Sequence, residues 1–271
     1  MRRVALGTGL TLAVHEQGDG EPVLLLHAWG ETHRVFDGLV PLLPGSLRLI
    51  APDQRGVGDS AKPAGGYGPR DAADDMIALL DALGIRRCWV VGTSSGGYVA
   101  QQIAAEHPDR VRGLVLIGSP SDLRGLVPDA LRSLLEGFGD PVTRDDVAAV
   151  NAAIAVHAPV APAFLAVQTD AALTIPKHVW LAVLDGLATA VPPTRGGRIA
   201  VPTLILWGAD DDVLPAAQAD ELARAIPGSR LVSYESTGHL VLWERPERVA
   251  ADLAAFIAPE PRHPDPSRVH G

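Results

Sequence analysis

Six short runs of apolar residues recur along this chain of 271 residues, and longer stretches with helical spacing separate them. The apolar runs are 22–28, 47–53, 88–94, 111–119, 201–208 and 230–236. The stretches with helical spacing are 71–84, 96–107, 215–226 and 246–257. The apolar runs are continuous, not alternating, which is typical of parallel strands covered on both faces. The alternation therefore predicts an α/β fold with a doubly wound, mostly parallel sheet.

The two ends of the chain depart from this alternation. Residues 2–6 and 10–16 predict an antiparallel hairpin at one edge of the sheet. Two arginines and an apolar stretch at the start resemble a signal peptide, but glycines and threonines interrupt the stretch and no small-residue cleavage pattern follows. The tail, 259–271, is rich in proline and polar residues, a composition that favours disorder.

Residues 120–199 contain no convincing strand. Four helical patterns lie there, separated by prolines, at 128–137, 144–156, 161–172 and 177–190. We interpret this region as a helical cap inserted between two strands of the sheet. The α/β core would then comprise residues 1–119 and 200–258.

Charge and cysteine content exclude several classes of partner. The net charge of −9 argues against binding to nucleic acid or to an anionic membrane surface, because both attract clusters of lysine and arginine. No apolar run reaches the length of a transmembrane helix. Cys88 is the only cysteine, so an intrachain disulfide is impossible and a cysteine metal site is implausible. We expect a soluble, cytoplasmic protein, a monomer or a homodimer, with no metal ion and no organic cofactor.

The segment Gly92-Thr93-Ser94-Ser95-Gly96 follows a predicted strand and precedes a predicted helix, the setting that a G-x-S-x-G nucleophile turn requires. Such a serine lies in a strained turn, and small residues two positions away on either side allow it. This spacing selects Ser94 as the candidate nucleophile and leaves Ser95 to contribute its backbone N–H. Taken alone, the segment is equally compatible with a glycine-rich turn that has no chemistry.

A serine hydroxyl needs a base to activate it, and the base needs an acid to hold its tautomer. Acidic residues follow the apolar run in "LILWGADDDVLP", and His239 follows the last run in "ESTGHLVLWERPE". Both segments lie at the carboxyl ends of predicted strands, where open α/β sheets place their sites. The order serine, acid, histidine is also the order of one known class of hydrolases.

Five segments together resemble the α/β-hydrolase-fold enzymes, over residues 10–258. They are "LLLHAWG" (24–30), "DQRGVGDS" (53–60), "GTSSGG" (92–97), "WGADDDVLP" (207–215) and "GHLVLWERPE" (238–247). The resemblance implies that Ser94 is the nucleophile, Asp211 the acid and His239 the base. A minority arrangement in this family would instead place the acid at Asp122, in "GSPSD".

The same resemblance implies an oxyanion hole made by the backbone N–H groups of Trp29 and Ser95. Ala28 stands where the family usually has glycine, and its methyl group can be tolerated if φ stays negative. His27 is interpreted as structural, and Asp53 and Arg55 as residues that brace their loop.

The implied reaction is hydrolysis of a carboxylic ester or lactone through an acyl-enzyme. We expect a small, uncharged, apolar substrate in a pocket formed by Leu126, Phe138, Phe164 and Trp180. Two alternatives use the same three residues: C–C bond hydrolysis and perhydrolysis. A third is a ligand-binding protein without catalysis. Epoxide hydrolases and haloalkane dehalogenases are disfavoured, since they have aspartate where Ser94 stands.

Overall fold

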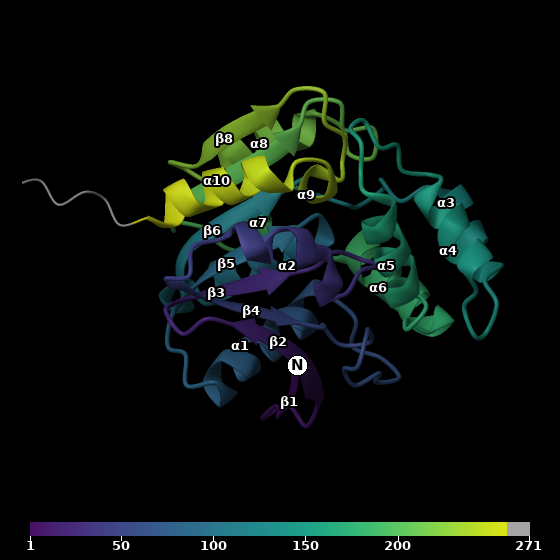
Figure 1. Ribbon diagram of the computed structural model, residues 1–271, viewed down its shortest axis with the longest axis horizontal. Helices are drawn as coiled ribbons and strands as arrows, with labels where there is room; N and C mark the ends of the chain where they lie inside the picture. The colour runs from purple at the N-terminus through teal and green to yellow at the C-terminus, as the bar shows by residue number, and fades with distance from the viewer. Residues whose placement is uncertain (259–271) are drawn as a thin grey trace, which may run out of the picture.

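A computed structural model describes residues 1–258, so the predicted disorder of 259–271 lies outside the described residues. One eight-stranded sheet runs through the molecule in the order β1-β2-β4-β3-β5-β6-β7-β8 (Figure 1). Its strands are β1 (Arg2–Ala5), β2 (Thr11–Gln17), β3 (Glu21–Leu26), β4 (Leu47–Pro52), β5 (Cys88–Thr93), β6 (Val111–Ile117), β7 (Thr203–Gly208) and β8 (Arg230–Tyr234). The β1–β2 and β2–β4 pairs are antiparallel and the other pairs are parallel, which confirms the predicted fold class and the N-terminal hairpin.

Both faces of the sheet are covered, which explains the continuous apolar strands. In β3, Leu24 and Leu26 join one apolar cluster, whereas Val23 and Leu25 join the cluster on the other face. The first cluster includes residues of α1 (Pro69–Ala82), α2 (Ser95–Glu106) and α8 (Ala217–Ala225). The second includes residues of α9 (Val241–Glu244), α10 (Pro246–Ile257) and the 3-10 turns η1 (His33–Gly38) and η2 (Val40–Leu42). None of the helices in residues 1–258 is long and apolar enough to cross a lipid bilayer.

The strand order reverses at β3, because β4 pairs with one side of it and β5 with the other. In an open α/β sheet such a reversal leaves a crevice at the carboxyl ends of the strands, and ligands bind there. The segments that follow β3 and β5 therefore meet at this crevice. They begin at His27 and at Ser94.

Between β6 and β7 the chain forms five helices. They are α3 (Asp129–Glu136), α4 (Arg144–Asn151), α5 (Pro162–Ala172), α6 (Lys177–Thr189) and α7 (Pro193–Gly196). Figure 1 shows α3 to α6 gathered at one side of the sheet, and they share an apolar cluster of their own. Val57 and Tyr67, from the segment after β4, join that cluster. The last helix, α7, lies against α2.

The predicted helix over 144–156 is too long, because α4 ends at Asn151. The backbone N–H of His157 donates to Glu244 Oε2 at 3.2 Å. Within a continuing helix that N–H would donate to the carbonyl four residues earlier. After α4 the chain thus runs toward α9, a long-range contact that the local sequence pattern does not reveal.

A buried ion pair braces the segment after β4. Arg55 Nε donates to Asp75 Oδ2 at 2.6 Å, and the Asp75 side chain is fully buried. The Arg55 guanidinium also donates to the carbonyl oxygens of Gly66 and Asp71. Nearby, Asp53 Oδ1 accepts hydrogen bonds from the backbone N–H and the ring of His33. These contacts support the interpretation of Asp53 and Arg55 as bracing residues.

We expect Asp75→Asn to lower the free energy of unfolding by about 3–5 kcal/mol, because it leaves the Arg55 charge buried without its partner. Urea denaturation followed by circular dichroism measures the change. Arg70→Gln is the matched control, since it breaks an ion pair with Glu106 in which the arginine is largely exposed. Equal shifts of the urea midpoint in the two variants would contradict a special contribution of the buried pair.

Candidate active site

Ser94 occupies the sharp turn between β5 and α2, with φ 46° and ψ −120°. Its backbone N–H donates to the carbonyl of Ile117 at 2.8 Å. A Cβ atom on Gly92 would lie 2.4 Å from the Gly96 oxygen, and one on Gly96 would lie 2.3 Å from the Leu26 oxygen. The two glycines are therefore required by close backbone approach, as the motif predicts. A non-glycine residue with positive φ costs about 1–3 kcal/mol, which the surrounding structure must offset.

The structure brings Ser94, His239 and Asp211 into one hydrogen-bonded chain. Ser94 Oγ lies 2.9 Å from His239 Nε2, and His239 Nδ1 lies 2.8 Å from Asp211 Oδ2. Because a carboxylate only accepts, Nδ1 carries the ring proton, and Nε2 offers its lone pair to the serine hydroxyl. This is the arrangement of a nucleophile, a general base and the acid that orients the base.

Asp211, the candidate acid, is held in place by its own loop. Asp211 Oδ1 accepts the backbone N–H groups of Val213 and Leu214, each at 2.9 Å. The Asp211 side chain is 1% exposed, whereas Asp210 and Asp212 are exposed. This placement of the acid after β7 agrees with the order of the sequence motifs.

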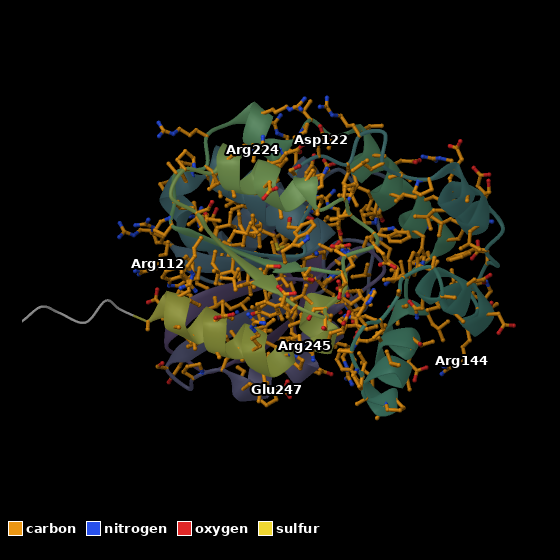
Figure 2. The ribbon with its side chains drawn as sticks, turned by 90° about the horizontal axis from the view of Figure 1, so that it is seen from above. Arg112, Asp122, Arg144, Arg224, Arg245 and Glu247 are labelled. Atoms are coloured by element: carbon orange, nitrogen blue, oxygen red, sulfur yellow. The ribbon has the colours of Figure 1, made fainter. Side chains whose placement is uncertain are left out.

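The structure does not bring Asp122, the other candidate acid, to His239. Its carboxylate binds Arg124, whose side-chain and backbone hydrogen bonds hold the pKa of Asp122 below its usual value. Arg195 lies 3.7 Å from the same carboxylate. Asp122 is thus engaged in a salt bridge near the surface (Figure 2).

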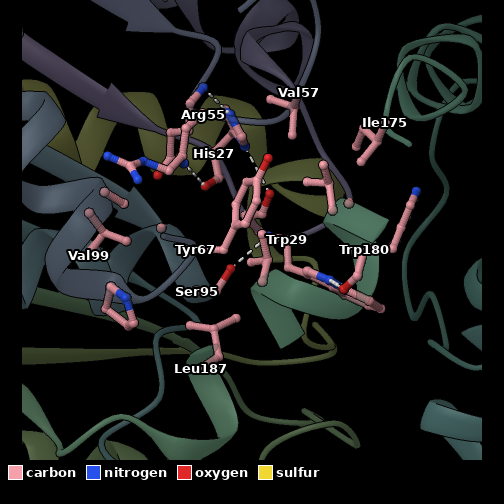
Figure 3. Close-up of a pocket in the computed structure, with 18 of the residues that line it drawn as sticks. His27, Trp29, Arg55, Val57, Tyr67, Ser95, Val99, Ile175, Trp180 and Leu187 are labelled. Atoms are coloured by element: carbon pink, nitrogen blue, oxygen red, sulfur yellow. Dashed lines mark hydrogen bonds between the residues drawn. The ribbon is translucent and has the colours of Figure 1, made fainter. Parts of the chain in front are cut away.

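The peptide group between Ala28 and Trp29 has both of its polar atoms engaged. Its carbonyl accepts from His27 Nδ1 at 2.9 Å and from the Glu31 N–H at 3.2 Å. Its N–H, on Trp29, donates to Ser95 Oγ at 2.7 Å (Figure 3). Ala28 keeps a negative φ, so its methyl group fits. The contact with the Ser95 hydroxyl was not predicted, since the sequence motif gives Ser95 only a backbone role.

His27 holds this peptide as a neutral ring. The backbone N–H of Gln54 donates to His27 Nε2 at 3.0 Å, so the ring proton is on Nδ1, where it reaches the Ala28 carbonyl. Burial lowers the pKa of His27, which keeps the ring uncharged. The interpretation of His27 as structural agrees with these contacts.

Glu31 binds the backbone of the segment after β3, a role that the sequence analysis did not predict. Its Oε2 accepts the Ala28 N–H at 2.8 Å, and its Oε1 accepts Trp243 Nε1 at 3.0 Å. Burial raises the pKa of Glu31 to about 7. No local pattern signals this role, because Trp243 is 212 residues further along the chain.

A narrow cleft lies behind Trp29 and Ser95, enclosing about 550 Å³ with its open mouth included. Its walls come from the segments after β3 and β4, the first turns of α1 and α2, and α6 (Figure 3). The apolar members of these walls are Ala28, Trp29, Val57, Tyr67, Pro69, Ala72, Val99, Ile175, Val179, Trp180, Val183 and Leu187.

Of the four predicted pocket residues, only Trp180 lines this cleft. Leu126 is 38% exposed. Phe138 packs inside the α3–α6 cluster, edge-on to Trp180, and Phe164 packs edge-on to Trp243. These three residues do not line this cleft, because apolar residues of a helical segment pack against one another as readily as against a ligand.

We expect Glu31 to contribute a loss of stability as pH rises from about 5 to 8, whereas His27, whose pKa is lowered by burial, contributes in the opposite direction below pH 6.5. The pKa of Glu31 rises from 4.5 to about 7 on folding, so the folded chain holds a proton that the unfolded chain releases in this interval. The stabilising contribution is complete below pH 4.5 and is lost as the pH rises through 7, a change on the order of 2 kcal/mol. Thermal unfolding from pH 5 to 8 measures it.

Glu31→Gln should remove the Glu31 contribution, because an amide does not titrate, so the variant should lose less stability than the wild type between pH 5 and 8. Glu235→Gln, which alters an exposed side chain at the end of β8, is the control and should leave the slope unchanged. Identical slopes in the wild type and in Glu31→Gln would contradict the proposed titration.

Known proteins resemble the chain over most of its length. It is 31% identical to a 2-hydroxymuconate semialdehyde hydrolase from Pseudomonas sp. (strain CF600), over 94% of this chain and 93% of that protein. It is 30% identical to a pimeloyl-[acyl-carrier protein] methyl ester esterase from Neisseria meningitidis, over 87% and 92%.

Similarity extends to solved structures. The enol-lactonase from Burkholderia xenovorans LB400 superposes with a TM-score of 0.80 at 25% identity, covering 94% of this chain and 99% of that one. The sequence pattern of the alpha/beta hydrolase fold family matches residues 21–246. With this match and the geometry above, the chain belongs to the alpha/beta hydrolase fold family.

Proposed function

We propose that this protein is a serine hydrolase that cleaves a carboxylic ester or a lactone through an acyl-enzyme. The observation that carries the proposal is the hydrogen-bonded chain from Ser94 through His239 to Asp211, with a carboxylate at one end and a serine of positive φ at the other. The esterase and lactonase among the similar proteins support the same class of bond.

In the proposed reaction, His239 Nε2 takes the proton of Ser94 as Oγ attacks the carbonyl carbon. Asp211 stabilises the imidazolium that forms, through its contact with Nδ1. The imidazolium then protonates the leaving alcohol, and the acyl group stays on Ser94. Water, activated by the same ring, attacks the acyl-enzyme and releases the acid. For a lactone, the acid and the alcohol leave as one molecule.

The negative oxygen of the tetrahedral intermediate would accept hydrogen bonds from the backbone N–H groups of Trp29 and Ser95. Ser95 begins α2, so the helix N-terminus also favours negative charge there. In the free protein the Trp29 N–H is held by Ser95 Oγ, and the substrate oxygen must replace that hydroxyl. Each such donor contributes about 3 kcal/mol of transition-state stabilisation.

The helices α3 to α6 would act as a cap over this site. The cleft beneath α6, which Trp29 and Ser95 line but Ser94 and His239 do not, would hold the apolar part of the substrate. Among the residues that line the cleft, the one arginine or lysine is Arg55, whose guanidinium is engaged by Asp75 and two carbonyl groups. Arg132 of α3 pairs with Asp185 of α6, and Arg144 of α4 pairs with Asp170 of α5. Arg144 projects outward (Figure 2). An uncharged substrate fits these walls.

C–C bond hydrolysis is the second candidate, because one similar protein is a 2-hydroxymuconate semialdehyde hydrolase. A muconate carries a carboxylate, which would be costly to bury in a cleft without a free cation. The ester or lactone is therefore the first choice. Perhydrolysis uses the same three residues with peroxide in place of water.

We expect Ser94→Ala to abolish hydrolysis of p-nitrophenyl esters, whereas Ser95→Ala keeps most of it. The Ser95 backbone N–H survives the change, and the lost hydroxyl only competes for the Trp29 N–H. Initial rates measure the effect, and mass spectrometry locates an active-site phosphonate label. Equal loss of activity in both variants would contradict the assignment of Ser94.

We expect Asp211→Asn to lower kcat by a factor of about 10³–10⁴, because the amide leaves His239 in the wrong tautomer. Asp122→Asn should keep nearly full activity, since that side chain binds Arg124 and does not reach His239. A large loss in Asp122→Asn with little loss in Asp211→Asn would place the acid after β6 instead.

A panel of acyl esters, lactones and a vinylogous C–C substrate would decide between the candidate reactions. Turnover of esters or lactones with a phosphonate on Ser94 supports the proposal. Preferred turnover of the C–C substrate would favour the second candidate. If no substrate turns over and Ser94 stays unlabelled, the protein is a ligand-binding member of the family.

A further inference from the structure

Residues 28–31, here called the oxyanion loop, are supported from two sides. On one side, the Ala28 carbonyl accepts from His27, and the Ala28 N–H donates to Glu31, whose carboxylate is itself bound by Trp243. The next two residues rest on α6. Trp29 Nε1 donates to the carbonyl of Trp180 at 2.9 Å, and the two rings meet edge to face, with centroids 4.9 Å apart and planes at 87°.

Gly30 shows how closely Trp180 approaches the backbone of this loop. Gly30 has φ +77°, and a Cβ atom there would lie 2.6 Å from two atoms of the Trp180 ring. The ring therefore lies against the loop backbone itself. Figure 3 shows Trp29 and Trp180 together at one wall of the cleft.

Trp180 is also part of the α3–α6 cluster. It is 2% exposed and packs edge-on to Phe138, with ring centroids 5.6 Å apart. A shift of α6 would therefore move the ring that lies on Gly30 and the carbonyl that binds the Trp29 indole. Since interiors are closely packed, such a shift is transmitted to the loop and not absorbed.

Resting on the proposed function, we propose that Trp180 is a positioning residue: it holds Trp29 so that the Trp29 N–H meets the developing oxyanion. Trp29 and Trp180 both line the cleft, so a substrate whose apolar group fills the cleft presses on this pair. Preference for such substrates would then appear in kcat as well as in KM, because the substrate contact that fixes α6 also aligns the Trp29 N–H with the oxyanion.

The test compares Trp180→Ala and Trp180→Phe on p-nitrophenyl acetate, whose short acyl group leaves the cleft empty. We expect Trp180→Ala to lower kcat by a factor of about 10–100 with little change in KM, since full loss of one oxyanion donor costs about 10²–10³. Trp180→Phe should recover kcat to within a factor of about 3, because a ring still covers Gly30. The affinity of a trifluoromethyl ketone, which forms an oxyanion on Ser94, should fall in parallel with kcat.

Val147→Ala is the matched control. Val147 is buried in the same helical cluster but does not line the cleft, so this variant should keep the kcat of acetate hydrolysis. Should Trp180→Ala fail to fold by circular dichroism, Trp29→Phe replaces it, because it keeps an aromatic ring and removes only the indole donor to the Trp180 carbonyl. It should lower kcat in the same direction.

The inference is overturned if Trp180→Ala, or Trp29→Phe in its place, leaves the acetate kcat unchanged and only raises KM for long-chain esters. Trp180 would then be a wall of the cleft and nothing more. Ser94→Ala separates this failure from a failure of the proposed function. If Ser94→Ala abolishes turnover while the tryptophan variants keep kcat, only the positioning role is lost, whereas turnover in Ser94→Ala would remove the proposed function as well.

Discussion

The backbone turn at Ser94 is the constraint on which the rest of the site depends. Its positive φ presents the hydroxyl to His239 and starts α2 immediately afterwards, so that the next N–H is free of the helix ladder. The turn is possible only because Gly96 lies against the last carbonyls of β3. That close approach also brings the loop after β3, with Trp29, beside the serine. One steric requirement thus places the candidate nucleophile and both candidate oxyanion donors.

Most of the fold could be predicted because burial on both faces of a parallel sheet leaves continuous apolar runs in the sequence. The bounds of α1 and α10 were predicted to within about two residues, because each buries an apolar stripe at helical spacing. Those of α2 were predicted as closely, because the glycine-framed turn at Ser94 marks its start. The end of α4 at Asn151 was not predicted, and the segment after it contacts Glu244 through the His157 N–H, a long-range partner that the local pattern does not show. The four-residue α9 is too short to carry a helical period.

Part of the candidate site could likewise be predicted from the sequence, and part could not. Ser94, Asp211 and His239 each follow a strand within a short motif, so their convergence at one sheet edge follows from the fold. The supports of the oxyanion loop do not follow from it. Glu31 and Trp180 act through contacts with residues more than 150 positions away, and nothing in their own sequence neighbourhood marks them.

Two histidines with the same tautomer show why the chemistry is confined to one end of this site. His27 and His239 both carry the proton on Nδ1, but His27 gives it to a peptide carbonyl and its Nε2 is occupied by a backbone N–H. A second proton on His27 would break that contact and put a charge in an apolar interior, with no carboxylate bound to the ring. His239 instead has Asp211 on one side and the Ser94 hydroxyl on the other. In the proposed mechanism only this ring can accept a proton and return it, while His27 remains a fixed hydrogen-bond partner that aims the Trp29 peptide.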